Sequence, residues 1–111
     1  MGAYVTAVAS AARTTSSNSG VLSGFGNWSK FRAQLNVSAA SGTTPTLDVV
    51  IEDTFDGGTT WNTIATFTQK TAAAVQALDV TGLFTDQMRV RWTIGGTTPS
   101  FTFDVKLYGG G

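Results

Sequence analysis

The sequence of 111 residues contains no cysteine and no histidine, and these two absences remove several classes of chemistry. Without cysteine the chain has no disulfide and no thiol nucleophile, and without either residue the usual zinc sites cannot form. Histidine is also the side chain that most often acts as a general base. Carboxylates remain as ligands for Ca²⁺, but no loop places them at the alternate positions of a calcium-binding loop. We therefore expect no cofactor and no metal site.

Charged residues are scarce as well, at 13% of the chain, and seven cations balance seven anions. Proteins that bind nucleic acid neutralise phosphates with clustered Lys and Arg side chains, whereas the seven cations here are scattered and form no basic block, although Arg89 and Arg91 lie close together. No apolar run approaches the roughly twenty residues that cross a bilayer. The first residues, Met1–Tyr4, also lack the basic region that precedes the apolar stretch of a secretory signal. The sequence predicts neither a nucleic-acid partner nor a membrane partner.

The remaining polar residues do not form a recognisable catalytic set. A serine nucleophile would lack a histidine base, and no Gly-x-Ser-x-Gly elbow is present. Hydrolysis by a carboxylate pair requires two acidic groups that face each other across a cleft. Glu52 is the only glutamate, Asp53 beside it points to the opposite face of a strand, and Asp56 belongs to a turn. We expect a non-enzymatic protein.

What the chain does contain is Thr, Ser and 13 Gly residues, with β-branched and aromatic residues at alternating positions. A period of two is typical of strands with one buried face. Residues 72–80 fit either a short helix, because of three consecutive Ala, or a strand, which the surrounding strands favour. The sequence thus predicts one all-β domain, an antiparallel two-sheet sandwich of seven or eight strands, jelly-roll-like or, as the alternative, immunoglobulin-like. The other expected strands are residues 3–9, 13–17, 31–38, 47–52, 61–68, 88–94 and 101–107.

Two turns are expected inside this pattern, at residues 39–45 and 96–99. The second would form a hairpin that pairs Trp92 with Phe103 inside the core. The same register would place Arg91 opposite Asp104 on the outside, so both faces support it. In the connection at residues 81–86, which lies between these two turns in the sequence, Leu83 or Phe84 would pack into the end of the core. The expected core is Phe31, Leu35, Val49, Ile51, Trp61, Val90, Trp92, Phe101 and Phe103.

One turn has a more specific signature. Thr54, Asp56, Gly58, Thr60 and Trp61 fit the pattern Ser/Thr-x-Asp-x-Gly-x-Thr-Trp, and this resembles the Asp box of sialidase propellers. In that family the Asp binds turn amides and the Trp packs beneath the hairpin. The pattern occurs once here, whereas a propeller would repeat it. We interpret it as a structural turn between two strands, because Asp and Gly already explain it.

The N-terminal part differs in composition from the rest. Residues 1–28 are rich in Ser and Gly and predict a strand or arm followed by a loop, whereas residues 29–111 predict the sandwich body. We expect this segment to lack order on its own, because its apolar residues are widely spaced. Phe25 and Trp28 have a second interpretation, as a plug at one end of the core. The candidate partner contacts are Tyr4, Val21, Leu22, Phe25 and Trp28.

Two longer stretches carry a family resemblance. The run Leu47–Asp53 with Asp56–Trp61, and then Arg89–Phe103, resembles small virion proteins of tailed bacteriophages. The resemblance covers roughly the C-terminal two-thirds of the chain. It implies a structural protein of the phage particle, assembled in the host cytoplasm and bound to the major capsid protein or other virion proteins. It implies no catalytic residue, and self-association stays open.

Within this resemblance we expect a capsid decoration, or cement, protein, in which residues 1–28 act as the contact arm. Two alternatives remain. A neck or tail-associated protein would have the same composition and would differ in copy number. A carbohydrate-binding module, from another functional class, would need coplanar exposed aromatic residues, for which Trp28, Tyr108 and Phe55 are the candidates.

Overall fold

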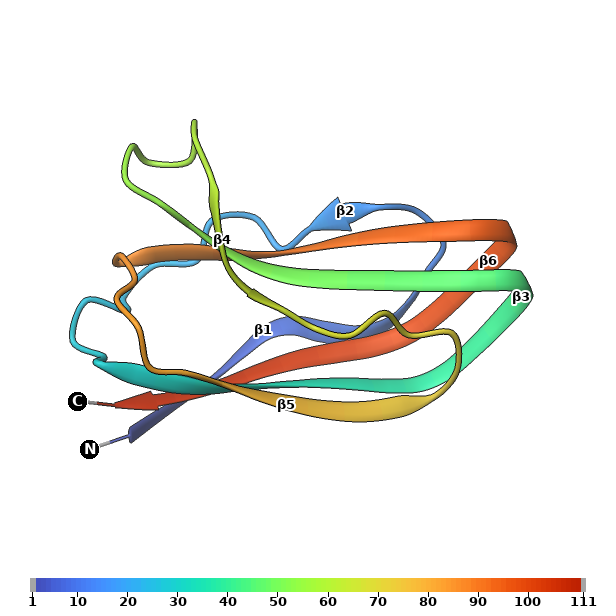
Figure 1. Cartoon of the computed structure of the whole chain (residues 1–111), viewed down its shortest axis with the longest axis horizontal. Helices are drawn as coiled ribbons and strands as arrows, with labels where there is room; N and C mark the ends of the chain where they lie inside the picture. Colours follow the sequence, from blue (N-terminus) through green and yellow to red (C-terminus); the bar gives the residue numbers. More distant parts are fainter. Residues whose placement is uncertain (1, 111) are drawn as a thin grey trace.

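The computed structural model describes residues 2–110, which form an all-β fold of six strands (Figure 1). Two of the strands are much longer than the sequence pattern predicts, at 25 and 24 residues. Residues 72–80, for which the sequence left helix and strand open, contain a strand over Ala74–Val80. The strands are β1 Gly2–Arg13, β2 Ser17–Asn18, β3 Lys30–Thr54, β4 Asn62–Thr66, β5 Ala74–Val80 and β6 Gln87–Gly110.

All six strands belong to one antiparallel sheet with the order β1-β6-β3-β4, in which β2 also pairs with β6 and β5 also pairs with β3. Because β3 and β6 bend together, this sheet folds over into two facing layers (Figure 1). The terminal layer consists of β1, the C-terminal half of β6, the N-terminal half of β3, and β5. The Asp-box layer consists of β2, the N-terminal half of β6, the C-terminal half of β3, and β4.

The bend lies where the sequence predicted two turns, and that prediction is wrong. Both strands continue through it, in segments that share the sequence Gly-Thr-Thr-Pro at residues 42–45 and 96–99. Gly42 and Gly96 have φ of 116° and 109°, and the second Thr of each segment has φ of 46°. A Cβ on Gly42 would lie 2.8 Å from the carbonyl oxygen of Thr98, and one on Gly96 would lie 2.7 Å from that of Thr44. Glycine therefore permits the two segments to cross closely, as local two-fold equivalents.

The hairpin predicted between Trp92 and Phe103 does not form. Trp92 pairs instead with Val49, and Phe103 pairs with Val37. The two rings still meet, with centroids 5.5 Å apart and an interplanar angle of 78°, because the two layers face each other. The predicted contact of Arg91 with Asp104 is also wrong, since the two residues lie in different layers.

The core fills the space between the layers. All the predicted core residues are buried except Trp61, which is half-buried on the outside of the Asp-box layer. Phe84, not Leu83, packs into the end of the core, with its ring edge-on to Phe31 at 5.1 Å, whereas Leu83 is fully exposed.

Residues 2–28 are integrated in the sheet rather than forming a separate arm. Strand β1 pairs with β6 along most of its length. Backbone amides of the loop that follows donate hydrogen bonds to carbonyls at the start of β6. Ser19 donates to Val90, Leu22 donates to Met88, and Phe25 donates to Asp86, which immediately precedes β6. Widely spaced apolar residues suffice for this arrangement, because the body supplies both the hydrogen-bond partners and the core.

Candidate interaction surfaces

The turn between β3 and β4 has the geometry of an Asp box. The Asp56 carboxylate accepts hydrogen bonds from the backbone amides of Thr59 and Thr60, at 3.1 and 2.8 Å. The Thr54 hydroxyl donates to Asp56 at 2.8 Å and accepts from the amide of Gly58 at 3.0 Å. These donors, led by the Thr60 amide, lower the pKa of Asp56 to about 2. The carboxylate is therefore committed to holding the turn closed.

Trp61 at the end of this turn is held by two contacts. Its indole N–H donates to the carbonyl of Gly58 at 3.0 Å. Its ring lies under the guanidinium of Arg89, whose central carbon is 4.2 Å from the ring centroid. The indole thus covers part of the outer face of the Asp-box layer.

Arg89 and Arg91, two residues apart on β6, share one buried partner. Glu52 accepts from Arg89 at 2.8 Å and from Arg91 at 3.2 Å, and only 7% of its side chain is exposed. Its neighbour Asp53 is also buried and accepts from the amide of Thr85 at 3.0 Å. Both carboxylates therefore have intramolecular partners and do not face each other across a cleft.

The five candidate partner contacts are divided between core and surface. Phe25 is buried, which corrects its assignment as a contact, and its ring packs against Trp28 at 4.9 Å. Trp28 is half-buried over Gly109, where a Cβ would overlap its ring. Leu22 is half-buried in the loop, whereas Tyr4 and Val21 are exposed. Only the last two are therefore freely available to a partner.

The outer face of the terminal layer brings together side chains from both ends of the chain. Tyr4 on β1 lies directly opposite Tyr108 on β6, and these side chains are 60% and 58% exposed. Tyr108 lies next to Arg32 on β3, which in turn is opposite Asp79 on β5. The Arg32 guanidinium donates two hydrogen bonds to Asp79, at 2.6 and 3.1 Å, and the hydrogen bond holds the pKa of this carboxyl below its ordinary value. We call this row of four residues the tyrosine row.

The sequence-based interpretation did not pair Tyr4 with Tyr108. Both residues occupy exposed, outward positions of the two terminal strands. Their adjacency, however, depends on the antiparallel pairing of β1 with β6, which no local signal specifies.

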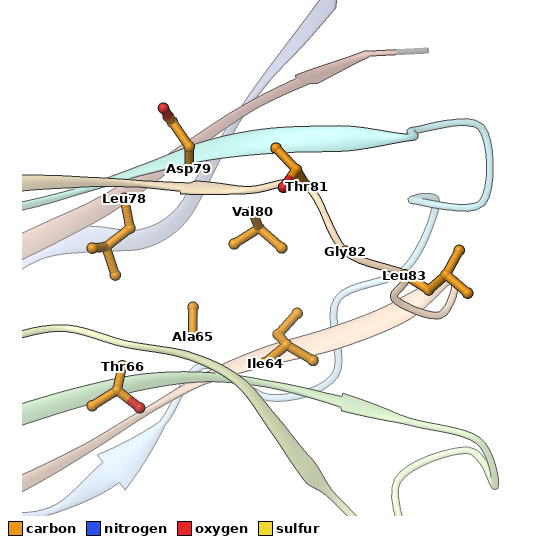
Figure 2. A pocket seen from close by; sticks show the side chains of 9 residues that line it. All are labelled: Ile64, Ala65, Thr66, Leu78, Asp79, Val80, Thr81, Gly82 and Leu83. Carbon is orange, nitrogen blue, oxygen red and sulfur yellow. The ribbon is translucent and has the colours of Figure 1, made fainter.

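A groove opens between the free edges of β4 and β5, with a volume of about 480 Å³ (Figure 2). Leu78, Val80 and Ile64 point into it, whereas Asp79 points away toward the outer face. Ile64 occupies this position because β4 carries one extra residue opposite the step from Ile51 to Glu52. The groove is open to solvent, and its lining combines these apolar side chains with polar groups that include Thr66 and Thr81.

Among residues 2–110, no group of three or more acidic side chains is placed to hold a metal ion. That part of the chain also has no helix with the length and hydropathy needed to cross a membrane.

The sequence matches no family model and no curated protein. Solved structures do share its fold. The SPBc2 prophage-derived protein YomS is similar with a TM-score of 0.57 and 14% identity, over 98% of this chain and 92% of that one. The PBSX exported protein XepA gives a TM-score of 0.56 and 18% identity, over 99% of this chain and 35% of XepA.

Viral and carbohydrate-binding structures are similar as well. Infectious bursal disease virus, Gx strain, gives a TM-score of 0.56 and 15% identity over 98% of this chain and 31% of the viral one. A Clostridium thermocellum xylanase, comprising CBM22-1 and GH10 modules in complex with xylohexaose, gives a TM-score of 0.51 and 14% identity. That match covers 82% of this chain and 19% of the xylanase chain. This chain thus spans about a third of XepA and of the viral chain. At these identities the similarity establishes a shared β-fold.

Proposed function

We propose that this protein is a non-enzymatic structural protein of a bacteriophage particle with a jelly-roll topology. When each half of β3 and β6 is counted as a strand, the chain has eight strands. Numbered in chain order, they form the layers 1-8-3-6 and 2-7-4-5. This is the strand order of a jelly roll, which is common in viral capsid domains. An immunoglobulin-like domain would pair its first strand with its second instead.

The observation that carries the functional proposal is the similarity to YomS. It extends over nearly the whole length of both chains, and that protein is prophage-derived. XepA, the second similar protein, comes from PBSX and contains a region of this fold. The neighbouring carboxylates Glu52 and Asp53 both have structural partners among the described residues, which supports a structural role for them.

We place the protein on the head as a decoration protein, with a neck or tail position as the alternative. A decoration protein binds a repeated lattice, so modest contacts are multiplied by avidity. Its net charge of zero avoids repulsion between crowded copies. The exposed edge strands and the exposed Val21 and Tyr4 are available for contacts with the major capsid protein or with another copy of this chain.

The test is the copy number of this protein in purified particles, measured by quantitative mass spectrometry against the major capsid protein. A number of the same order as the capsid protein is expected for decoration. A handful of copies would move the protein to the neck or tail, and its absence from particles would refute a structural role in the virion.

A carbohydrate-binding module is the second candidate. The similarity to the xylanase structure favours it, and so does the exposed Tyr4–Tyr108 pair. The residues first considered for such a platform do not form one. Trp28 packs over Gly109 on the inner side of the terminal layer, Phe55 lies in the Asp-box turn, and Tyr108 is on the outer face.

A further inference from the structure

We propose that the outer face of the terminal layer binds a neutral oligosaccharide, with Tyr4 and Tyr108 as the stacking platform and the Arg32–Asp79 pair as the polar end of the site. This inference rests on the second candidate function, the carbohydrate-binding module, and specifies its site and ligand class. The proposal stands on the geometry of this face and does not depend on where the protein is located.

The first argument is placement. Directly opposed residues on antiparallel strands have Cβ atoms about 5 Å apart and project from the same face. Tyr4 and Tyr108 are opposed in this way, and the tyrosine row continues across β3 and β5 through Arg32 to Asp79. Four strands span three inter-strand spacings, or about 14 Å. The row therefore has the length of an oligosaccharide rather than of a single sugar.

The second argument is the chemistry of the side chains. Tyrosine offers an apolar ring that stacks on the C–H face of a pyranose and a hydroxyl that bonds to its edge. Among the described residues no aromatic ring packs on Tyr4 or Tyr108, in contrast to Trp92, whose ring meets Phe103. Arg32 and Asp79 fix each other through two hydrogen bonds and keep 67% and 58% of their side chains exposed. They therefore offer preorganised donors and acceptors to sugar hydroxyls.

The outward residues beside the tyrosine row, Lys106, Gln34 and Ala77, extend this polar surface. Lys106 lies between Tyr108 and Asp104 on β6, and its ammonium is 6.0 Å from the centre of the Tyr4 ring. It is opposite Gln34, whose neighbour across the next strand is Ala77. The ammonium of Lys106 thus approaches one side of the Tyr4 ring, and both tyrosines stay more than half exposed.

The third argument is charge. The outward positions of the terminal layer carry three cations and two anions, and two of these charges neutralise each other in the Arg32–Asp79 pair. A single excess positive charge does not support binding of nucleic acid or an anionic membrane, which requires clustered cations. Aromatic rings on a nearly neutral polar surface favour a neutral, hydroxyl-rich ligand. The five charged residues are Lys30, Arg32, Asp79, Asp104 and Lys106.

The test is affinity electrophoresis of the full chain in native gels that contain soluble neutral polysaccharides. Mixed-linkage β-glucan, xylan, galactomannan and dextran are the neutral probes, and heparin is the anionic one. We expect retardation by at least one neutral probe. Tyr4→Ala and Tyr108→Ala should each weaken it by about tenfold, since loss of one stacked ring removes on the order of one decade of affinity.

Three variants make the result specific. Tyr108→Phe keeps the ring and should retain most of the binding. Phe55→Ala removes an aromatic residue that is 83% exposed but lies in the Asp-box turn, so its binding should equal that of the wild type. Arg32→Gln breaks the polar end of the row and should weaken binding without removing stacking. Circular dichroism of each variant establishes that it is folded.

Failure of retardation with all neutral probes would overturn the proposal, and so would equal binding by the wild type and the two Ala variants. Retardation by heparin alone would mean an anion site and would also overturn it. These results are independent of the copy number in particles, so a failure of the ligand proposal and a failure of the structural role can be told apart.

Discussion

The outer faces of the two layers differ in how far their aromatic and charged side chains are exposed. On the Asp-box layer, Trp61 stacks on Arg89 and donates to its own turn, and Glu52 is shared by two arginines. On the terminal layer, Tyr4 and Tyr108 lie side by side and are mostly exposed. The same residue types therefore stabilise the fold on one face and remain available to a ligand on the other. The difference lies in exposure, because the terminal layer also pairs Arg32 with Asp79 but leaves both tyrosines more than half exposed.

The largest effect is expected for Glu52→Gln. The substitution keeps the shape of the side chain but leaves Arg89 and Arg91 without their anion. We therefore expect the free energy of unfolding to fall by about 2–4 kcal/mol. The loss is smaller than for a fully buried ion pair because Arg91 is partly exposed. Urea denaturation measures this. Asp79→Asn, which breaks the exposed ion pair of the other face, is the control and should change stability far less.

Trp61→Ala should have the next largest effect, about 2 kcal/mol. It removes a half-buried ring, the contact with Arg89 and the hydrogen bond to Gly58. Trp61→Phe keeps a ring over Arg89 and should lose only about half as much. If both variants unfold at the wild-type urea concentration, Trp61 does not stabilise the Asp-box layer.

Asp56→Asn should destabilise the protein in a way that depends on pH. The carboxyl has a pKa of about 2 in the folded protein, below the ordinary value of 3.8, so its contribution is present above pH 4 and disappears as the pH falls toward 2. The difference in melting temperature between wild type and variant should therefore shrink over this range. A constant difference from pH 6 to pH 2 would contradict the role of the ionised carboxylate.

The smallest effect on stability is expected for Tyr4→Ala and Tyr108→Ala. Substitutions of exposed residues usually change the free energy of unfolding by no more than about 0.5 kcal/mol. Thermal denaturation of the two single variants and the double variant checks this. A loss above about 2 kcal/mol would show that the tyrosines stabilise the terminal layer, and the contrast between the faces would disappear.

Sequence patterns predicted what depends on local chemistry. The alternation of residues 31–38 and 101–107 gave the correct buried faces, and the spacing of Asp56 and Gly58 indicated the turn whose hydrogen bonds the structure contains. What depends on long-range pairing was missed. Gly-Thr-Thr-Pro indicates a turn when it is considered alone, and only the second copy, which crosses the first, converts it into a bend of a continuous strand.

The N-terminal segment illustrates the same limit. Its apolar residues are too sparse to form a core, so the sequence indicated a free arm. In the structure the C-terminal strand supplies the hydrogen bonds and buries Val8. The pair of Tyr4 and Tyr108 arises from that contact between the two ends of the chain, which is why no local pattern revealed it.

Retardation in a polysaccharide gel, compared between Glu52→Gln and the double variant Tyr4→Ala/Tyr108→Ala, tests the contrast between the faces most directly. Both variants are examined at a temperature at which circular dichroism shows them folded. We predict that Glu52→Gln is retarded like the wild type despite its lower stability, and that the tyrosine variant migrates freely despite its normal stability. Equal retardation of the two variants would contradict the assignment of the terminal layer as the binding face.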